Sequence, residues 1–304
     1  LEKYAELIVK SGLNVQKGQE VVVRCGLDQP EFVAVVVEEL YKAGAERVTM
    51  EWDYMPVTKL AYEYRSLESL SEFTEIAEAK LKRRADKFSC LLWLDSEDPD
   101  GLNGTDHEKI AKARMAQYPF IKPYNDAIEN KYQWCIAAVP GKEWAEKVFP
   151  GLPADEAVEK LWEAILDASR VDDDPVAAWD RHNKTLKERC AFLNEHRFDY
   201  LEYKSSNGTD FKVWLNEKGL FLGGAEKNLN NNIWYNPNIP SEEVFTSPLS
   251  GKAEGKVVAT KPLSYQGKLI ENFWVEFKDG KVVKTGAEKN GDLLDQMVKM
   301  DEGA

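Results

Sequence analysis

Two adjacent glutamates, Glu242 and Glu243, stand where the sequence constrains its own backbone most strongly. Residues 236–248 contain three prolines, which fix φ and remove amide donors, so this stretch is neither a helix interior nor a central strand. We expect a rigid, extended segment that enters a short strand at residues 244–246. Neighbouring side chains of a strand point to opposite faces, so one carboxylate can face a packed interior and the other water.

A carboxylate that faces a protein interior needs a metal ion, a base or a hydrogen-bond network as its partner. The alternative is a solvated loop that carries two surface acids, because glutamate is rarely fully buried. The local sequence leaves both possibilities open.

The overall composition limits the classes of partner. The 304 residues have a formal net charge of -13, whereas a nucleic-acid-binding protein needs a basic surface, so we expect no nucleic-acid partner. No apolar run approaches the length of a transmembrane helix, and we expect no membrane partner. With 43% hydrophobic residues the chain can bury a sizeable core. These features together favour a soluble cytoplasmic protein.

Four cysteines lie far apart and form no Cys-x-x-Cys motif, so neither a zinc ribbon nor a thioredoxin site is expected. Cys25, Cys90 and Cys135 fall within apolar, strand-like runs, where a buried free thiol is the usual state. We predict that these three and Cys190 are all free thiols, as in a reducing compartment.

The pattern of apolar residues changes along the chain. In the first half, helical periodicity alternates with apolar runs, which predicts an α/β fold with an open, mostly parallel sheet and flanking helices. The predicted parallel strands lie near residues 20–25, 47–52, 88–94 and 132–139. From residue 199 the period is two, which predicts a mainly antiparallel sheet. Its expected strands are residues 200–204, 209–215, 252–260, 268–277 and 281–287.

Other candidate motifs fit structural roles better than chemistry. The loop at residues 25–30 has one glycine where a dinucleotide site needs three. The acidic loop at residues 96–101 leaves the carboxyl end of a strand but lacks calcium-loop spacing, and it favours a cap for the next helix at Thr105 or Asp106. Residues 172–174 favour a helix cap as well. The three histidines have no zinc-binding spacing.

Several stretches together resemble the aminopeptidase T and aminopeptidase S family of metallo-aminopeptidases, over the whole chain. They are residues 1–5, 12–18, 208–210, 238–246, 261–265 and 301–304. The most specific of them is residues 238–246, in which the family binds its catalytic metal pair through the second glutamate. The resemblance therefore implies that Glu243 is a metal ligand and that Glu242 is not.

The resemblance also implies the domain organisation. We expect an N-terminal α/β domain over residues 1–235 and the incomplete start of a mainly antiparallel metallopeptidase domain over residues 236–304. In the family a second glutamate ligand follows shortly after the Asp-Glu-Gly-Ala stretch, here residues 301–304, and a later set of His and Asp ligands lies further along. We therefore expect a C-terminally truncated chain that keeps one ligand.

The implied activity is hydrolysis of peptide substrates at their N-termini by a homodimer. Two divalent metal ions, zinc, cobalt or similar, would activate the attacking water. We expect this 304-residue chain to bind no metal and to be inactive by itself. The catalytic residues other than metal ligands stay unknown. The alternative is a non-catalytic α/β module that binds small ligands or peptides.

Overall fold

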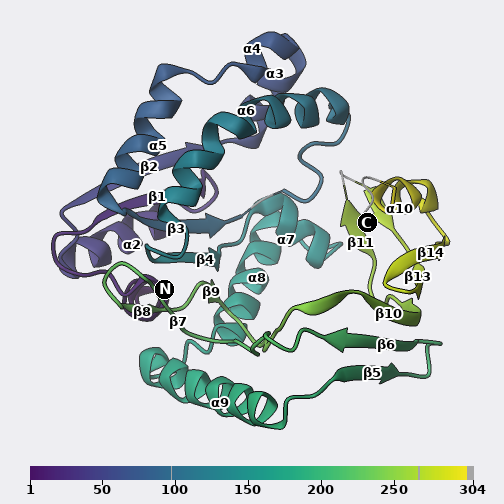
Figure 1. Ribbon diagram of the computed structural model, residues 1–304. Helices are drawn as coiled ribbons and strands as arrows, with labels where there is room; N and C mark the ends of the chain where they lie inside the picture. Colours follow the sequence, from purple (N-terminus) through teal and green to yellow (C-terminus); the bar gives the residue numbers. More distant parts are fainter. Residues whose placement is uncertain (97, 266–267, 300–304) are drawn as a thin grey trace. The chain divides into compact units, whose positions relative to one another are not determined.

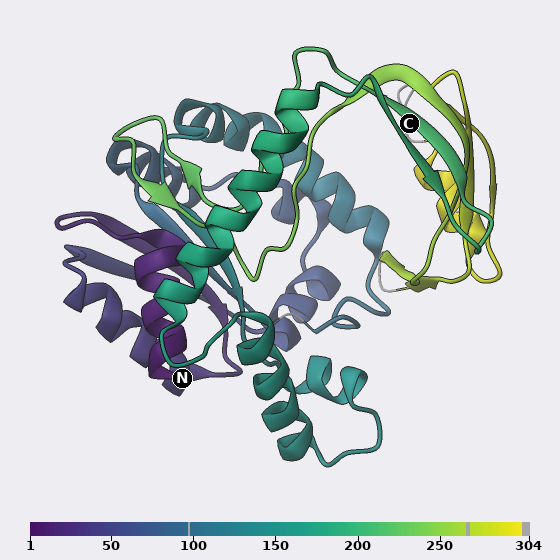
Figure 2. The ribbon, with the colours of Figure 1, turned by 90° about the horizontal axis from the view of Figure 1, so that it is seen from below.

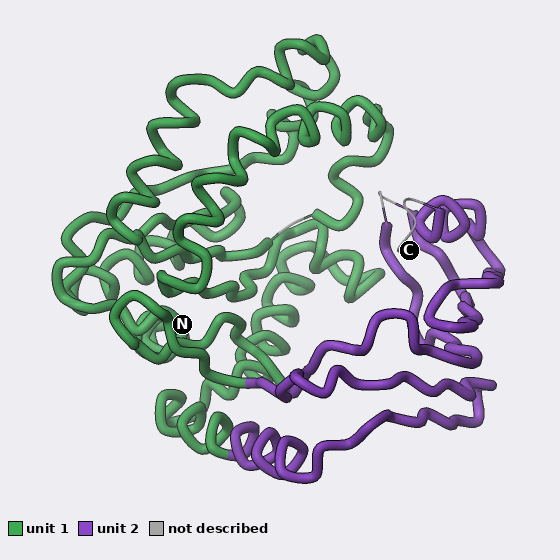
Figure 3. The backbone as a smooth tube through the Cα atoms, viewed as in Figure 1, with its two compact units in different colours: residues 1–184, 224–242 green, residues 185–223, 243–304 purple. Residues whose placement is uncertain are grey.

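The computed structural model describes residues 1–96, 98–265 and 268–299 (Figure 1). These residues form two compact units, which Figure 3 colours separately. The first unit consists of residues 1–184 and 224–242, and the second of residues 185–223 and 243–304. No helix within the described ranges is both long enough and apolar enough to cross a membrane.

The first unit is built around a five-stranded parallel sheet. Its strands are β1 (Glu20–Gly26), β2 (Arg47–Asp53), β3 (Cys90–Asp95), β4 (Trp134–Ala138) and β9 (Asn238–Ile239). The spatial order is β2-β1-β3-β4-β9, and every neighbouring pair is parallel. The four strands predicted from the apolar runs are therefore confirmed. The fifth strand, β9, lies at one edge of the sheet.

Helices connect these strands, as parallel pairing requires. They are α1 (Glu2–Leu7), the π-helix η1 (Ile8–Leu13), α2 (Pro30–Lys42), α3 (Met55–Tyr64), α4 (Leu67–Ser71), α5 (Glu75–Lys87), α6 (His107–Ile128), α7 (Lys142–Val148) and α8 (Ala154–Ala168). The long helix α9 (Pro175–His196) starts in the first unit and ends in the second, and Figure 2 shows it unbroken. A two-stranded ribbon, β7 (Glu226–Lys227) and β8 (Trp234–Tyr235), belongs to the first unit.

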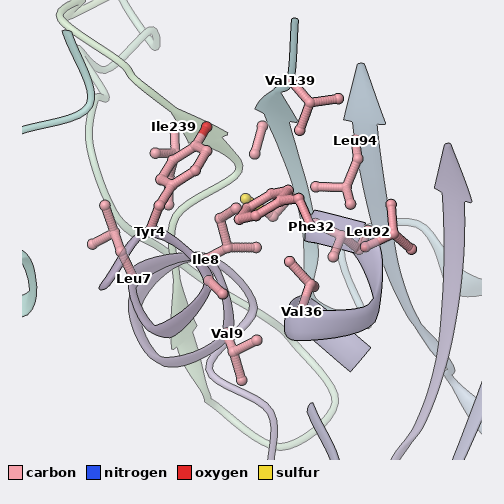
Figure 4. Packing of buried hydrophobic residues seen from close by; sticks show 14 of the residues in the cluster. Tyr4, Leu7, Ile8, Val9, Phe32, Val36, Leu92, Leu94, Val139 and Ile239 are labelled. Atoms are coloured by element: carbon pink, nitrogen blue, oxygen red, sulfur yellow. The ribbon is translucent and has the colours of Figure 1, made fainter. Parts of the chain in front are cut away.

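One face of the parallel sheet carries the hydrophobic core (Figure 4). Val21 and Val23 of β1 are fully buried in it, as alternation along a strand requires. Tyr4 of α1, Phe32 of α2 and Trp162 of α8 meet there. The ring centroid of Phe32 lies 5.6 Å from that of Tyr4 and 5.1 Å from that of Trp162, and the centroids of Tyr4 and Trp162 lie 6.3 Å apart. These aromatic contacts fix α1, α2 and α8 against one another.

The opposite face of β1 is polar. Arg24 Nε donates to Glu51 Oε2 of β2 at 2.8 Å, and Lys80 Nζ of α5 lies 3.4 Å from Glu51 Oε1. Helix α5 has no buried residue among its thirteen. Ion pairs rather than apolar packing therefore connect α5 to this part of the sheet.

The second unit contains a five-stranded antiparallel sheet with the order β14-β13-β10-β6-β5. Its strands are β5 (Tyr200–Lys204), β6 (Asp210–Leu215), β10 (Pro248–Val258), β13 (Trp274–Lys278) and β14 (Lys281–Gly286). A ribbon of β11 (Leu263–Tyr265) and β12 (Lys268–Ile270) and the helix α10 (Gly291–Met297) complete it. The predicted hairpin of β5 and β6 is confirmed. The single strand predicted at residues 268–277 is wrong, because Asn272 has a φ of 48° and separates β12 from β13.

The centre of this sheet requires a glycine. Gly255 of β10 pairs with Phe211 on one side and Phe277 on the other, and the two rings lie 5.4 Å apart by their centroids. Gly255 has a φ of +99°, and a Cβ atom there would lie 2.2 Å from the carbonyl oxygen of Asp210. The aromatic pair and the close backbone approach therefore both depend on the missing side chain.

Candidate metal-ligand segment

The proline-framed stretch begins with an asparagine that is tied to the N-terminal helices. Asn236 is 4% exposed, and its Nδ2 donates to the carbonyl oxygen of Ser11 at 2.8 Å. Its backbone amide donates to the carbonyl oxygen of Gly12 at 2.8 Å. Two donors of one buried residue thus bind two carbonyl groups of a segment that is far away in the sequence.

The next residues join the parallel sheet. The carbonyl oxygen of Pro237 accepts from the amide of Ile136 at 2.8 Å, and β9 then pairs with β4. Ile239 is 2% exposed and belongs to the hydrophobic core (Figure 4), and the peptide bond from Ile239 to Pro240 is cis. The predicted rigid, extended lead-in is confirmed. Its place at a sheet edge fits a segment whose prolines cannot donate to a further strand.

Two residues of the first unit hold the end of this lead-in. His182 Nε2 lies 2.6 Å from the carbonyl oxygen of Ser241, and Arg170 Nη2 lies 2.5 Å from Glu242 Oε1. The His182 side chain is 10% exposed and packs edge-on against Trp179, with ring centroids 5.4 Å apart. Because the imidazole is held by α9, it fixes the backbone immediately before the two glutamates.

Glu242 therefore has a cationic partner of its own. Besides Arg170, His182 Nε2 lies 3.9 Å from Glu242 Oε2. A carboxylate paired in this way has less freedom to turn toward another ligand, which agrees with the expectation that Glu242 lies outside the metal site.

Glu243 is the first residue of the second unit after the lead-in. Its backbone passes close to Gly223, where a Cβ atom would lie 2.5 Å from the carbonyl oxygen of Glu243. Two residues further on, Phe245 forms an isolated antiparallel bridge with Leu222, and the amide of each donates to the carbonyl oxygen of the other. The backbone of Glu243 is thus placed by a glycine contact and a bridge.

One local expectation needs correction, and the exposure of the two glutamates matches the alternative of a solvated loop with two surface acids. Residues 244–246 form a single bridge rather than a strand, so strict alternation does not govern the two glutamates. Both Glu242 and Glu243 are exposed, so neither faces a packed interior in these units. The physical reason is that one bridge fixes one residue pair and leaves the side chains on either side of it free to face water.

The donor atoms around Glu243 do not amount to a metal site. Within residues 1–96, 98–265 and 268–299, no three His, Cys, Asp or Glu side chains are grouped closely enough to hold an ion. A divalent ion pair needs several oxygen and nitrogen donors, and Glu243 supplies one carboxylate. The described residues alone do not fit the complete metal pair, so Glu243 as a ligand stays a prediction.

The other predicted motifs have structural roles. Asp106 Oδ1 accepts from the amide of Lys109 at 2.9 Å, and Asp174 Oδ1 accepts from the amide of Ala177 at 3.0 Å, so both aspartates are helix caps as predicted. All four cysteines are free and buried, which confirms that prediction. The Asp-Glu-Gly-Ala stretch at residues 301–304 lies outside the described residues.

Sequence reasoning missed the two partners that hold the lead-in. No motif in the sequence marks His182 or Arg170 as a partner of residues 241 and 242. They lie 59 and 72 positions before their partners Ser241 and Glu242, and no local pattern connects residues so far apart. The buried side of α9 is the one signal that singles out His182.

Comparison with known proteins gives a consistent picture. The model of the family described as thermophilic metalloprotease (M29) matches residues 1–304. Aminopeptidase AmpS of Bacillus subtilis is 38% identical over 306 residues, which cover 100% of this chain and 74% of AmpS. Aminopeptidase T of Thermus aquaticus is 37% identical with the same coverage. The solved structure of wild-type AmpT from Thermus thermophilus superposes with a TM-score of 0.91 at 36% identity, over 99% of this chain and 75% of that one.

Proposed function

Because the chain belongs to the thermophilic metalloprotease (M29) family and is a metallo-aminopeptidase, we propose that it releases N-terminal residues from peptides with two divalent metal ions, zinc, cobalt or similar. Glu243 is the one metal ligand that we assign in the described residues. When bound, the metal ions would lower the pKa of the attacking water and polarise the scissile carbonyl.

The observation that carries this proposal is the anchoring of the segment before Glu243. Asn236, Ile239 and Ser241 are each fixed by a different part of the first unit, through hydrogen bonds, core packing and the His182 contact. A carboxylate that follows so constrained a backbone has little conformational entropy left to lose when it binds an ion. An ordinary surface acid needs no such support.

We propose that the catalytic domain begins at residue 236, with residues 1–235 as the N-terminal α/β domain and 236–304 as the start of the metallopeptidase domain. The antiparallel strands β10, β13 and β14 follow residue 236 and support this division, whereas β5 and β6 of the same sheet precede it and β9 of the parallel sheet follows it. The compact units divide the chain differently, because residues 185–223 belong to the second unit and residues 236–242 to the first. Residues 236–242 are thus the lead-in that the first unit holds for the catalytic domain.

We propose further that the 304 residues do not bind the metal pair and are inactive by themselves. Glu243 offers one carboxylate, whereas two ions need several ligands each. The resemblance places the remaining ligands further along the family's chains.

A cytoplasmic homodimer is the proposed biological form. The free, buried cysteines suit a reducing compartment.

Val57, Leu60 and Tyr64 of α3 are 60, 51 and 76% exposed, and their spacing places them on one stripe of the helix. Such an apolar stripe is typical of a surface that a second copy covers.

The test uses the purified natural protein and pairs of peptides with free and acetylated N-termini. We expect release of the first residue from free peptides alone, loss of activity with a chelator, and recovery on addition of zinc or cobalt ions. Activity that a chelator leaves unchanged would contradict the metal-dependent reaction. Peptide or small-ligand binding without hydrolysis under every metal would favour the non-catalytic module instead.

A further inference from the structure

A pocket of about 410 Å³ lies in the first unit, at the amino ends of the parallel strands. Its floor is formed by Arg84 near the end of α5, by Tyr132 and by Trp134 at the start of β4. Asp126 and Glu129, at the end of α6, stand at its exposed rim. The volume is in the range of pockets that bind small molecules.

The floor has a cation with one N–H group that lacks an acceptor. Arg84 Nη2 donates to the hydroxyl of Tyr132 at 2.7 Å, and the guanidinium lies 4.8 Å from the centroid of the Tyr132 ring. Arg84 Nε is buried without a hydrogen-bond partner among the described residues. Because Nε is buried, a ligand in the pocket would be bound through the terminal nitrogens of Arg84, and arginine and carboxylate form short, charge-assisted hydrogen bonds. The floor therefore favours a carboxylate ligand.

The rim favours a positive charge on the same ligand. Glu129 is exposed at the rim, and Asp126 is ion-paired with Lys122. The carboxylate of Glu129 near the entrance disfavours phosphates and other polyanions by like-charge repulsion. A ligand with one carboxylate and one ammonium group satisfies both ends of the pocket.

The two aromatic residues of the floor add the third requirement. Tyr132 and Trp134 present ring surface next to the guanidinium, and such surface stabilises an apolar or aromatic side chain. We propose that this pocket binds a free α-amino acid with an apolar or aromatic side chain, its carboxylate on Arg84 and its ammonium group on Glu129.

The proposed function also releases free amino acids, so this pocket would bind the product of the reaction. The role as a product sensor rests on the proposed function, whereas the binding of an amino acid to the pocket does not. The experiment therefore measures binding without turnover. L-phenylalanine is titrated by calorimetry into the purified natural protein in a buffer with a chelator, which removes catalytic metal. Phenethylamine and 3-phenylpropionate, which lack the carboxylate and the ammonium group respectively, are the matched ligands.

We expect L-phenylalanine to bind and both matched ligands to bind at least tenfold more weakly. Arg84→Gln and Glu129→Gln should each weaken binding at least tenfold, whereas Lys87→Gln, an exposed charge removed from the end of the same helix, should not. Glu243→Gln should bind normally, which separates this pocket from the catalytic centre.

Glu129 is exposed, so Glu129→Gln keeps the test decisive if Arg84→Gln alters the fold. Normal L-phenylalanine binding by folded Arg84→Gln and Glu129→Gln variants would overturn the assignment. So would the absence of L-phenylalanine binding, or equal binding of inorganic phosphate. A failure of peptide hydrolysis would leave these binding results unaffected.

Discussion

Gly12 of η1 lies where a side chain has almost no room. A Cβ atom at this position would lie 2.9 Å from Cys135 Sγ and 3.1 Å from Ile239 Cδ1, but 3.6 Å from Cys135 Cβ. Cys135 and Ile239 belong to β4 and β9, so the contact controls how the lead-in to Glu243 packs. Substitution of Gly12 tests this packing directly.

Two effects oppose each other in Gly12→Ala. Overpacking a core costs about 1–3 kcal/mol, and the helical backbone gains up to about 1 kcal/mol when alanine replaces glycine. We expect the free energy of unfolding to fall by about 0–2 kcal/mol. Cys135→Ala removes one buried sulfur atom, and should cost about 1 kcal/mol, as in other single-group deletions.

The double variant carries the decisive information. Without Sγ, the new methyl group would meet the Cβ atom of residue 135 at an ordinary 3.6 Å and would occupy part of the vacated volume. We expect the double variant to be more stable than the sum of the single changes by about 1–2 kcal/mol, the range of coupling between residues in contact. Urea unfolding of the wild type and the three variants measures this. Strictly additive free energies would refute the packing argument.

Three further predictions concern stability and reactivity. Burial raises the pKa of the Cys25 thiol to about 11 and that of Cys90 to about 12. Both thiols should therefore resist a thiol reagent at pH 8 until the protein is unfolded, which a colorimetric titration with and without denaturant would measure. Gly255→Ala should lower the free energy of unfolding by at least about 2 kcal/mol, because the positive φ and the backbone clash both oppose a side chain; unchanged thermal unfolding would contradict this. Burial raises the pKa of Glu51, but the hydrogen bonds and charges of Arg24 and Lys80 together lower it more, and the net shift is downward. A pKa that is lower in the folded state stabilises the fold at pH values above the unfolded-state pKa, and this stabilisation is lost as the pH falls through the folded-state pKa. The free energies of unfolding of wild type and Glu51→Gln should therefore approach each other in acid. A constant difference at every pH would contradict this.

The fold could be predicted as far as local patterns determine it. The apolar runs at β1 to β4 and the hairpin of β5 and β6 each carry a clear period, and the structure has them where the sequence places them. The break at Asn272 was missed because a single residue with a φ of 48° interrupts an otherwise regular strand pattern. Asparagine adopts this conformation more readily than most residues, which is the one available signal.

The surroundings of the two glutamates could be predicted only in part. Proline stiffness shows in the sequence, so the rigid lead-in was foreseeable. Its anchors were not, since Arg170 and His182 approach residues 241 and 242 through the packing of α8 and α9. The exposure of both carboxylates was one of two alternatives that the sequence left open, whereas the strand expected at residues 244–246 is replaced by a single bridge at Phe245.

The assignment of Glu243 is tested most directly by metal content. The natural protein and its Glu243→Gln and Glu242→Gln variants would be purified in parallel, and bound divalent metal measured per chain together with aminopeptidase turnover. We predict that Glu243→Gln loses metal and turnover severely, whereas Glu242→Gln keeps the metal content and turnover of the wild type. Normal metal stoichiometry and activity in Glu243→Gln would contradict the assignment and make Glu242 the next candidate.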